Sequence, residues 1–249
     1  MTQPVIFVVP DLQVPLHDPG FVSAMAQCIA DQGKRVQRVI TAGDEMDFTS
    51  IGRWSEGTPL AYTKALGKER DLWVQVATDL QVTDSVRSNH TDRLFNSIMR
   101  KVPGLLGVPE LQIDAFMRMP ELGITFHDKG LRLSSNTIVL HGDEAGVSQN
   151  SGTTAANLVK KVGMNVICGH THRAGLVPHT TSVQGQVTRV LYGIEVGHSM
   201  DIKKATYAKT HNWQQAWLAL YPDGKGNFTP NLMPVVRRSF IFEGIQYSW

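Results

Sequence analysis

Cysteine and long apolar runs are both scarce in this sequence. Cys28 and Cys168 are the two cysteines among 249 residues, too few for a disulfide framework, so we expect two buried, reduced thiols. No apolar run approaches the ~20 residues that a membrane-spanning helix needs. The run Val5–Val9 is short and no basic segment precedes it, so no signal peptide is expected. These absences predict a cytoplasmic protein without a membrane partner.

An excess of charge of one sign is also lacking. The chain carries 24 lysines and arginines against 22 aspartates and glutamates, a formal net charge of +2. This balance gives no sign of a broad positive surface for duplex nucleic acid, and it leaves a local basic groove open. The hydrophobic fraction of 42% is typical of a globular protein with a sizeable core. We interpret residues 1–249 as a single domain, and the sequence does not indicate its oligomeric state.

Strands and helices alternate over the first two-thirds of the chain. Apolar or β-branched runs predict strands at Val5–Val9, Val36–Thr41, 82–87, 137–140 and Asn165–Cys168. Helical spacing predicts helices at 21–32, within 50–84, within 93–122 and at Thr153–Val162. The last third is mostly β, with strands predicted at 188–194, 213–221 and 235–243 and a hairpin turn at 222–226. This order predicts an α/β fold of two packed sheets flanked by helices.

A polar cluster follows each of the five strands predicted in the first two-thirds. In open α/β sheets ligands bind beyond the carboxyl ends of the strands, so the five clusters are expected to meet at one rim. Together they supply the carboxylates, imidazoles and amides that hard-to-borderline divalent cations prefer. The clusters are Asp11-Leu12-Gln13, Gly43-Asp44-Glu45-Met46-Asp47, Asn89-His90, His141-Gly142-Asp143 and Gly169-His170-Thr171-His172.

The five clusters, in this order, resemble the calcineurin-like metallophosphoesterase family. The pattern is Asp-x-Gln, Gly-Asp-x-x-Asp, Asn-His, His-Gly and Gly-His-Thr-His, and it runs from Asp11 to Arg173. The β-rich tail with its Asp223-Gly224 turn is similar to the end of family members, and the compact chain looks like bacterial or bacteriophage members. The resemblance implies a four-layer α-β-β-α sandwich of two mixed sheets with helices outside. It also implies a metal-dependent phosphoric ester hydrolase.

A centre of two divalent metal ions is part of what the resemblance implies. Asp44 would bridge the ions, about 3.5–4 Å apart, and a hydroxide shared between them would attack phosphorus. Mn²⁺ is the expected ion, with Fe, Zn, Ni and Mg as alternatives. The first site would consist of Asp11, Gln13, Asp44 and His172, and the second of Asp44, Asn89, His141 and His170.

His90 and Asp47 match the family residues that act at the leaving group. His90 would protonate the leaving oxygen or stabilise the transition state, and Asp47 would orient its ring and favour the protonated form. Taken alone, His90 reads as a surface or helix-capping histidine and Asp47 as an N-cap. The five clusters together favour the catalytic interpretation. Substrate contacts are expected from Asn89, His90 and Arg173, although a solvated position suits Arg173 equally well.

Gln13 stands where most family members have histidine. An amide oxygen is a weaker ligand than imidazole for transition metals, so three outcomes are open. Gln13 still ligates and biases its site toward Mn²⁺ or Mg²⁺, or the first site is partly empty, or His17 takes its place. Two unequal metal sites are therefore predicted, with the tighter ion at His170. His198 is interpreted as structural, with a place near the rim as the alternative.

Two other positions depart from the family pattern. Ser88 and Thr91 flank Asn89-His90, where the family usually has glycine and an acid, which alters the local turn more than the chemistry. Phe48-Thr49 stands where protein serine/threonine phosphatases carry Arg-Gly. A protein phosphatase is therefore not expected.

The predicted function is a phosphodiesterase for small diesters such as cyclic nucleotides, with 2′,3′-cyclic nucleotides as the specific hypothesis. A DNA or RNA nuclease is the first alternative and predicts a basic groove beside the metals. A catalytically degenerate binding scaffold is the second, and the retention of a complete second site argues against it. The candidate groove residues are Lys64, Lys68, Arg70, Arg100 and Lys101.

Overall fold

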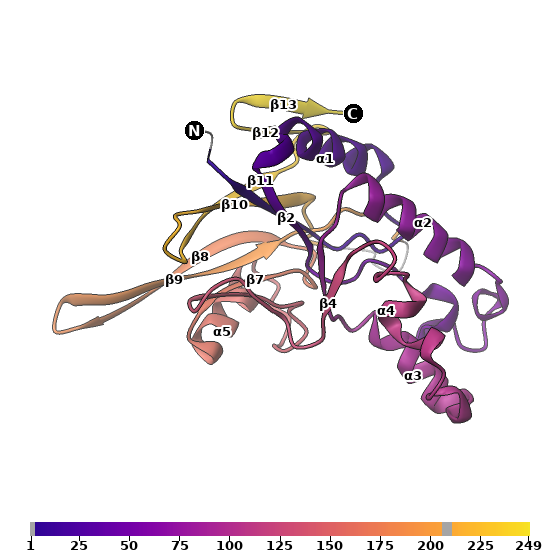
Figure 1. Ribbon diagram of the computed structural model, residues 1–249. Coiled ribbons are helices and arrows are strands. Elements are labelled where there is room, and N and C mark those ends of the chain that lie inside the picture. The colour runs from indigo at the N-terminus through magenta and orange to yellow at the C-terminus, as the bar shows by residue number, and fades with distance from the viewer. Residues whose placement is uncertain (1–2, 206–210) are drawn as a thin grey trace.

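Two mixed β-sheets pack against each other in the computed structural model, which describes residues 3–205 and 211–249 apart from the side chain of Trp54 (Figure 1). The first sheet has, in spatial order, β11 (Phe228–Pro234), β10 (Ala216–Pro222), β1 (Val5–Val9), β2 (Val36–Thr41), β3 (Asp84–Val86) and β4 (Thr125–His127). The second has β5 (Leu131–Arg132), β6 (Thr137–Val139), β7 (Asn165–Cys168), β9 (Gln186–Val196) and β8 (Ala174–Val183). The chain is therefore an α/β protein with mixed sheets.

The central strands of both sheets run parallel, so their carboxyl ends lie at a common edge. In the first sheet β1, β2, β3 and β4 are parallel, and Val9 pairs with Thr41 at the ends of β1 and β2. In the second sheet β6, β7 and β9 are parallel, with Cys168 opposite Glu195. Antiparallel strands β10, β11, β5 and β8 complete the sheets. The loops after β1, β2, β3, β6 and β7 are thereby brought together.

Apolar side chains on both faces of β1 explain why its sequence is continuously hydrophobic. Ile6 and Val8 point into the core between the two sheets, which they share with residues of β6, β7 and β9. Phe7 points to the opposite face and stacks on Trp217, with ring centroids 4.7 Å apart. A strand covered on both sides has no polar face, as the run Val5–Val9 predicted.

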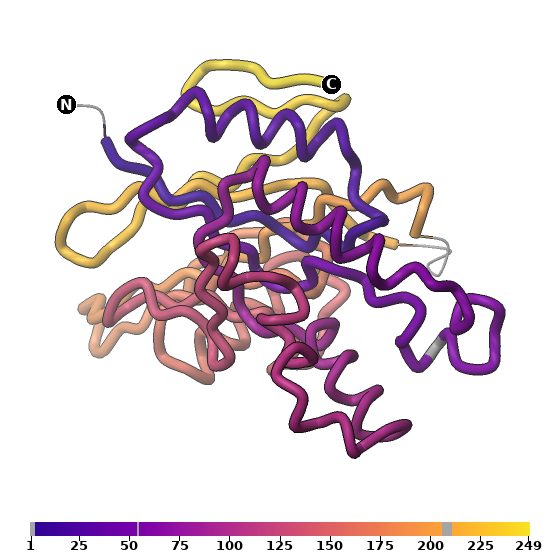
Figure 2. Tube along the Cα trace, turned by 45° about the vertical axis from the view of Figure 1, so that its right-hand side comes forward, coloured from indigo at the N-terminus to yellow at the C-terminus, as the bar shows by residue number. Residues whose placement is uncertain are grey.

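Helices cover the outer faces of both sheets. The first sheet is covered by α1 (Pro19–Gln32), α2 (Leu66–Asp79) and a small hairpin of β12 (Ser239–Phe242) and β13 (Ile245–Ser248), and the second by α5 (Thr153–Val162). Figure 2 follows α1 beside the carboxyl-terminal hairpin. Asp18 caps α1 by accepting from the backbone N–H of Gly20 and Phe21. Within the described residues, no helix is both long and apolar enough to cross a membrane.

Short helices fill the two long connections that the sequence predicted as helical. Between β2 and α2 lie three 3₁₀ turns, η2 (Thr49–Ile51), η3 (Arg53–Ser55) and η4 (Pro59–Tyr62), and η1 (Gly33–Arg35) precedes β2. Between β3 and β4 lie α3 (Asp92–Lys101), η5 (Pro103–Leu105), η6 (Pro109–Leu111) and α4 (Ile113–Phe116). Prolines at the start of η5 and η6 interrupt the helical pattern, as expected.

The early strands were predicted better than the late ones. β1, β2, β7 and α5 have the predicted bounds, and the turn at 222–226 joins β10 to β11. The single strand predicted at 235–243 was wrong, because β12 begins only at Ser239. Strands β4, β5, β8, β11 and β13 were missed. Proline interrupts the patterns of β8 and β11, which the sheets tolerate because both are edge strands.

Candidate metal centre

The ends of four strands, β1, β2, β6 and β7, bring two groups of metal-ligating side chains together. Three donor atoms in each group lie within 4.8 Å of one another. We call Asp44, His141 and His170 the His170 group, and Asp11, Asp44 and His172 the Asp11 group. Asp44 belongs to both groups. These are the two sets that the resemblance implied, apart from Gln13 and Asn89, and they rest on side chains up to 161 residues apart in the sequence.

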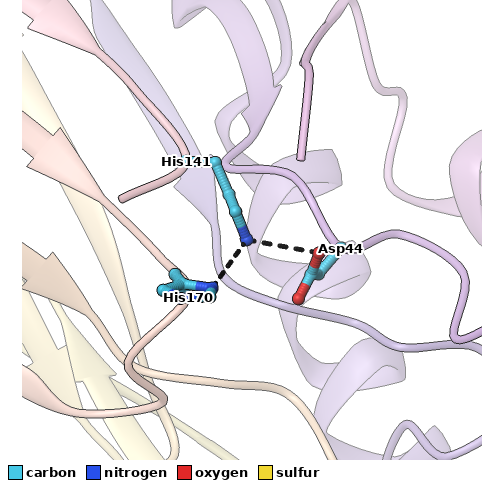
Figure 3. Close-up of side chains that lie close together, drawn as sticks. All are labelled: Asp44, His141 and His170. Atoms are coloured by element: carbon cyan, nitrogen blue, oxygen red, sulfur yellow. Dashed lines mark hydrogen bonds and ion pairs between the residues drawn. The ribbon is translucent and has the colours of Figure 1, made fainter. Parts of the chain in front are cut away.

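In the His170 group the side chains of Asp44 and His170 converge on Nε2 of His141. Nε2 of His141 lies 3.2 Å from Oδ1 of Asp44 and 3.2 Å from Nδ1 of His170, as Figure 3 shows. Oδ1 of Asn89 lies 3.0 Å from the same nitrogen. Nδ1 of His141 donates to the carbonyl oxygen of Ala42, 2.8 Å away, and so holds the ring with Nε2 turned toward the centre. Four potential ligands thus surround one small volume.

The Asp11 group is built from the loops after β1 and β7. Nε2 of His172 lies 3.3 Å from Oδ2 of Asp11. The side-chain amide nitrogen of Gln13 lies 3.1 Å from Nε2 of His172 and 3.4 Å from Oδ2 of Asp44, so the amide faces this group. Asp11 is fully buried, and no side-chain hydrogen bond from the described part of the chain reaches its carboxylate oxygens, which lie beside the backbone of His170. A bound cation would satisfy these oxygens.

Two glycines allow the loops to approach so closely. A Cβ added to Gly169 would overlap Oδ1 of Asp11. Gly43 has a φ of +91°, and a Cβ there would lie 2.6 Å from Nδ1 of His141. The backbone is also held in the left-handed region at four site residues, with φ of 45° at Gln13, 53° at Asp44, 65° at His170 and 56° at His172. Such conformations in non-glycine residues cluster at functional sites.

Two buried glutamates, neither of which the sequence singled out, hold the loops. Glu45 accepts hydrogen bonds from the hydroxyls of Thr41 and Ser85, at 2.5 and 2.6 Å, and so ties β2 to β3 beside Asp44. Glu195 accepts from the hydroxyl of Thr171 and from the first backbone N–H groups of α5. The Gly-His-Thr-His turn is therefore anchored through its threonine, between the two histidines that face the donor groups.

The electrostatics of the centre favour positive charge. Burial opposes ionisation of His141, but Asp44 and then Asp11 outweigh it and raise its pKa to about 10. Burial and the neighbouring charge of Asp44 raise the pKa of Asp11. Burial lowers the pKa of His170 and His172, so both imidazoles are neutral near pH 7, the form that binds metal. Donor chemistry, unsatisfied buried oxygens and charge all suit divalent cations.

His90 lies beside Asp44 and is contacted by an arginine that the sequence did not single out. Nε2 of His90 is 3.7 Å from Oδ2 of Asp44, and Nη2 of Arg93 is 2.6 Å from the same nitrogen. An arginine only donates, so Nε2 accepts and the ring proton lies on Nδ1, 3.3 Å from the carbonyl oxygen of Met46. Arg93 also donates to the carbonyl oxygen of Asp47. Its position three residues after His90 on a helical turn was the available signal.

Asp47 favours protonated His90, as expected, but it does not decide the charge of the ring. Asp47 lies 3.7 Å from Nδ1 of His90, close enough to attract a charged ring. Burial nevertheless lowers the pKa of His90, and the positive charge of Arg93 lowers it further, against the opposing effects of Asp44 and Asp47. The fixed cation at this position is therefore Arg93. Asp47 also accepts from the hydroxyl of Thr49 at the start of η2.

Arg173 and Asp143 have other partners. Arg173 is buried, so the solvated position was wrong, and its guanidinium donates to the carbonyl oxygen of Thr171 and to the side chain of Gln149 at 3.0 and 2.8 Å. It therefore braces the histidine turn. Asp143 pairs with Arg87, at 3.1 Å between Oδ2 and Nη1.

Neither His17 nor His198 belongs to a donor group within the described residues. His17 lines a cavity with residues of α1 and α2. His198 lies closer to the centre, with its ring centroid 5.9 Å from that of His172 and its backbone paired with Asp11. Its Nδ1 accepts from the backbone N–H of Met200, which agrees with the structural interpretation. Trp213, another missed residue, packs edge-on against His172 at 4.5 Å.

A groove of about 490 Å³ adjoins the centre at Asn89. Of the basic residues proposed from the sequence, Arg100 lines it, whereas Lys101 pairs with Glu56 and Arg70 pairs with Asp71. Lys64 and Lys68 are exposed and are not among its lining residues. The sequence missed two arginines that do line it, Arg53 and Arg93.

Comparison with known proteins relates the chain to two bacteriophage proteins. No protein-family model matches the sequence. The chain is 30% identical over 250 residues to the Gene 54 protein of Mycobacterium phage D29, and the alignment covers 96% of each chain. The identity and coverage are the same for the Gene 54 protein of Mycobacterium phage L5. The words "Gene 54 protein" state no activity. The extent of these matches shows that the chain belongs to the same family as the Gene 54 proteins of the two mycobacteriophages.

Proposed function

We propose that this protein is a metal-dependent phosphoesterase acting on phosphodiesters. The observation that carries the proposal is the pair of donor groups that share Asp44. Bound divalent ions would supply Lewis-acid stabilisation of a phosphoryl group and a water of lowered pKa as nucleophile. The order of the clusters and the layered arrangement of two sheets between helices support a calcineurin-like metallophosphoesterase fold.

Each of the two donor groups would hold one metal ion. The Asp11 group with Gln13 would hold one ion, and the His170 group with Asn89 would hold the other. Two observations support this assignment. The buried carboxylate of Asp11 receives no side-chain hydrogen bond, and the imidazole of His170 and the amide of Asn89 converge on His141. Mn²⁺ suits the mixture of carboxylate, amide and imidazole ligands, and Fe, Zn, Ni and Mg are the alternatives.

His90 and Arg93 would contact the substrate beside the metals. His90 is directed toward Asp44 and would lie at the leaving oxygen, either as a hydrogen-bond partner or, once its Nε2 has gained a proton, as the acid. Arg93 would supply the positive charge that His90, with its lowered pKa, does not carry near pH 7. A guanidinium beside a developing negative charge stabilises the transition state. A degenerate binding scaffold would have no use for this arrangement.

Metal analysis combined with a substrate panel tests the proposal. The protein is purified, its Mn, Fe, Zn and Ni are counted, and hydrolysis is assayed with added Mn²⁺. The substrates are p-nitrophenyl phosphate, bis(p-nitrophenyl) phosphate and 2′,3′- and 3′,5′-cyclic nucleotides. We expect diester hydrolysis that falls at least 100-fold in His90→Ala and is kept in His179→Ala, a matched change on β8. No hydrolysis of any substrate, or full activity in His90→Ala, would overturn the proposal.

A further inference from the structure

The groove beside Asn89 adjoins the His170 group through that asparagine. It is lined by Ile51, Arg53, Asn89, Arg93, Asn96 and Arg100. Asn89 faces the centre, with its Oδ1 3.0 Å from Nε2 of His141, and Arg93 contacts His90. A molecule in the groove would therefore be continuous with one held at the metals.

Three arginines make this groove positively charged. Arg53 comes from η3 and Arg93 and Arg100 from α3, so the charge is contributed by two separate segments. None of the described lining residues is a carboxylate. The cavity beside Arg87 differs, because Asp92 and Asp128 line it together with that arginine. Arginine charge thus gathers along the groove, and Arg93, next to the centre, also lies 3.6 Å from the carboxylate of Asp47.

The groove suits a substrate with more than one phosphate. Arg93 is held next to His90 and would face the scissile phosphate. Arg53, Asn96 and Arg100 are exposed along the groove, beside the place that a further phosphate would take, and Nε of Arg100 donates to the backbone carbonyl of Asn96. Guanidinium groups bind phosphate oxygens bidentately and also stack on bases, and an asparagine side chain hydrogen-bonds base edges or sugars. These are the contacts that a nucleic-acid strand makes.

We propose, resting on the function proposed above, that this groove binds the phosphate next to the scissile diester in a single-stranded nucleic acid. A cyclic mononucleotide has a single phosphate and would leave Arg53 and Arg100 unused. A duplex needs a broad positive surface, which a net charge of +2 does not provide. A single strand needs only a local basic groove with donors along it.

Comparing a strand with a small diester tests this inference. The probes are a fluorescein-labelled 12-residue DNA strand and bis(p-nitrophenyl) phosphate, both with Mn²⁺. The double variant Arg53→Gln/Arg100→Gln is expected to lower the ratio of kcat/KM for the strand to kcat/KM for the small diester by about tenfold. Arg189→Gln removes one arginine charge, half of the change in the double variant, from the exposed β8–β9 hairpin, at the opposite end of the molecule from α3 in Figure 1, and should leave the ratio as it is.

Binding of the strand is also measured by fluorescence polarisation, which needs no hydrolysis. The slope of log Kd against log salt should fall by about 0.7 in the double variant, since the one phosphate no longer neutralised in a single strand contributes about 0.7. Unchanged ratio and slope would overturn the inference. So would a nucleoside 3′,5′-bisphosphate that displaces the labelled strand as well as an unlabelled strand does.

The two proposals fail in distinguishable ways. If the proposed function is wrong, neither the strand nor the small diester is hydrolysed, whatever the polarisation measurement shows. If only the inference about the groove is wrong, the small diester is hydrolysed, and the strand binds weakly and equally well with or without Arg53 and Arg100. Melting temperatures of the double variant and of Arg189→Gln check that both fold.

Discussion

The two donor groups share Asp44 and differ in what surrounds it. At the His170 group, Nδ1 of His170, Oδ1 of Asp44 and the amide oxygen of Asn89 all lie within 3.2 Å of Nε2 of His141. The Asp11 group has one imidazole, and Gln13 presents an amide where the metallophosphoesterase pattern that the sequence resembles has histidine. Imidazole binds transition metals more strongly than a neutral amide does. One bridging carboxylate thus serves two sites of expected unequal strength, and four substitutions test this difference.

Asp44→Asn should have the largest effect, because it weakens both groups at once. The change keeps the shape of the side chain and removes the charge that both groups share. We expect loss of both ions and a fall in kcat/KM of about 10³-fold, equivalent to roughly 4 kcal/mol of transition-state stabilisation. Metal analysis after dialysis and the diesterase assay measure the two effects. Asp11→Asn, by comparison, should lose one ion only. Equal metal loss in both variants would contradict a shared Asp44.

His170→Ala should remove the tighter ion and leave the weaker one. Nδ1 of His170 is directed toward Nε2 of His141 and belongs to one group alone. We expect the affinity for the first ion added to fall about 100-fold. Calorimetric titration with Mn²⁺ measures it, with His179→Ala as the matched control. An unchanged first affinity would place the tighter ion at the Asp11 group instead.

Gln13→His should strengthen metal binding, whereas the substitutions above should weaken it. The side chain of Gln13 already faces His172 and Asp44, so an imidazole there would add a stronger ligand. We expect the weaker ion to bind about tenfold more tightly. His17→Ala should leave both affinities as they are, because His17 lines the cavity between α1 and α2. A loss of affinity in His17→Ala would favour His17 as the replacement ligand.

Glu69 provides a smaller test, because it is a buried carboxylate outside both groups. Burial, and then the charge of Asp47, raises its pKa from 4.5 to about 7. The folded protein therefore keeps a proton that the unfolded chain has lost, and stability should fall as pH rises from about 4.5 to 7. Glu69→Gln should remove this dependence and raise Tm by about 3 °C above pH 7, without changing metal content. Parallel Tm profiles of variant and wild type between pH 4.5 and 8 would contradict this.

The donor groups were predictable because their residues follow strands directly. The runs directly before Asp11, Asp44, His141 and His170 are short and mostly apolar, and parallel strands must end at one edge. The residues that support the centre carry no such signal. Glu195 reaches Thr171 only because β9 pairs with β7, a register that no local pattern specifies. Prediction from strand ends therefore found ligands and missed their supports.

Charge around the site was less predictable than the ligands. The pKa of His90 depends on the balance between its burial, Asp44, Asp47 and Arg93, and burial cannot be read from a motif. The groove depends on η3 and α3 being brought together next to Asn89. Arg53 and Arg93 were therefore missed, whereas Arg100 was named from charge alone.

Calorimetric titration of the metal-free protein with Mn²⁺ tests the central claim most directly. The account predicts two binding events of unequal affinity, of which His170→Ala removes the tighter and Gln13→His strengthens the weaker. A single binding event, two equal ones, or a pair that neither substitution alters would contradict it.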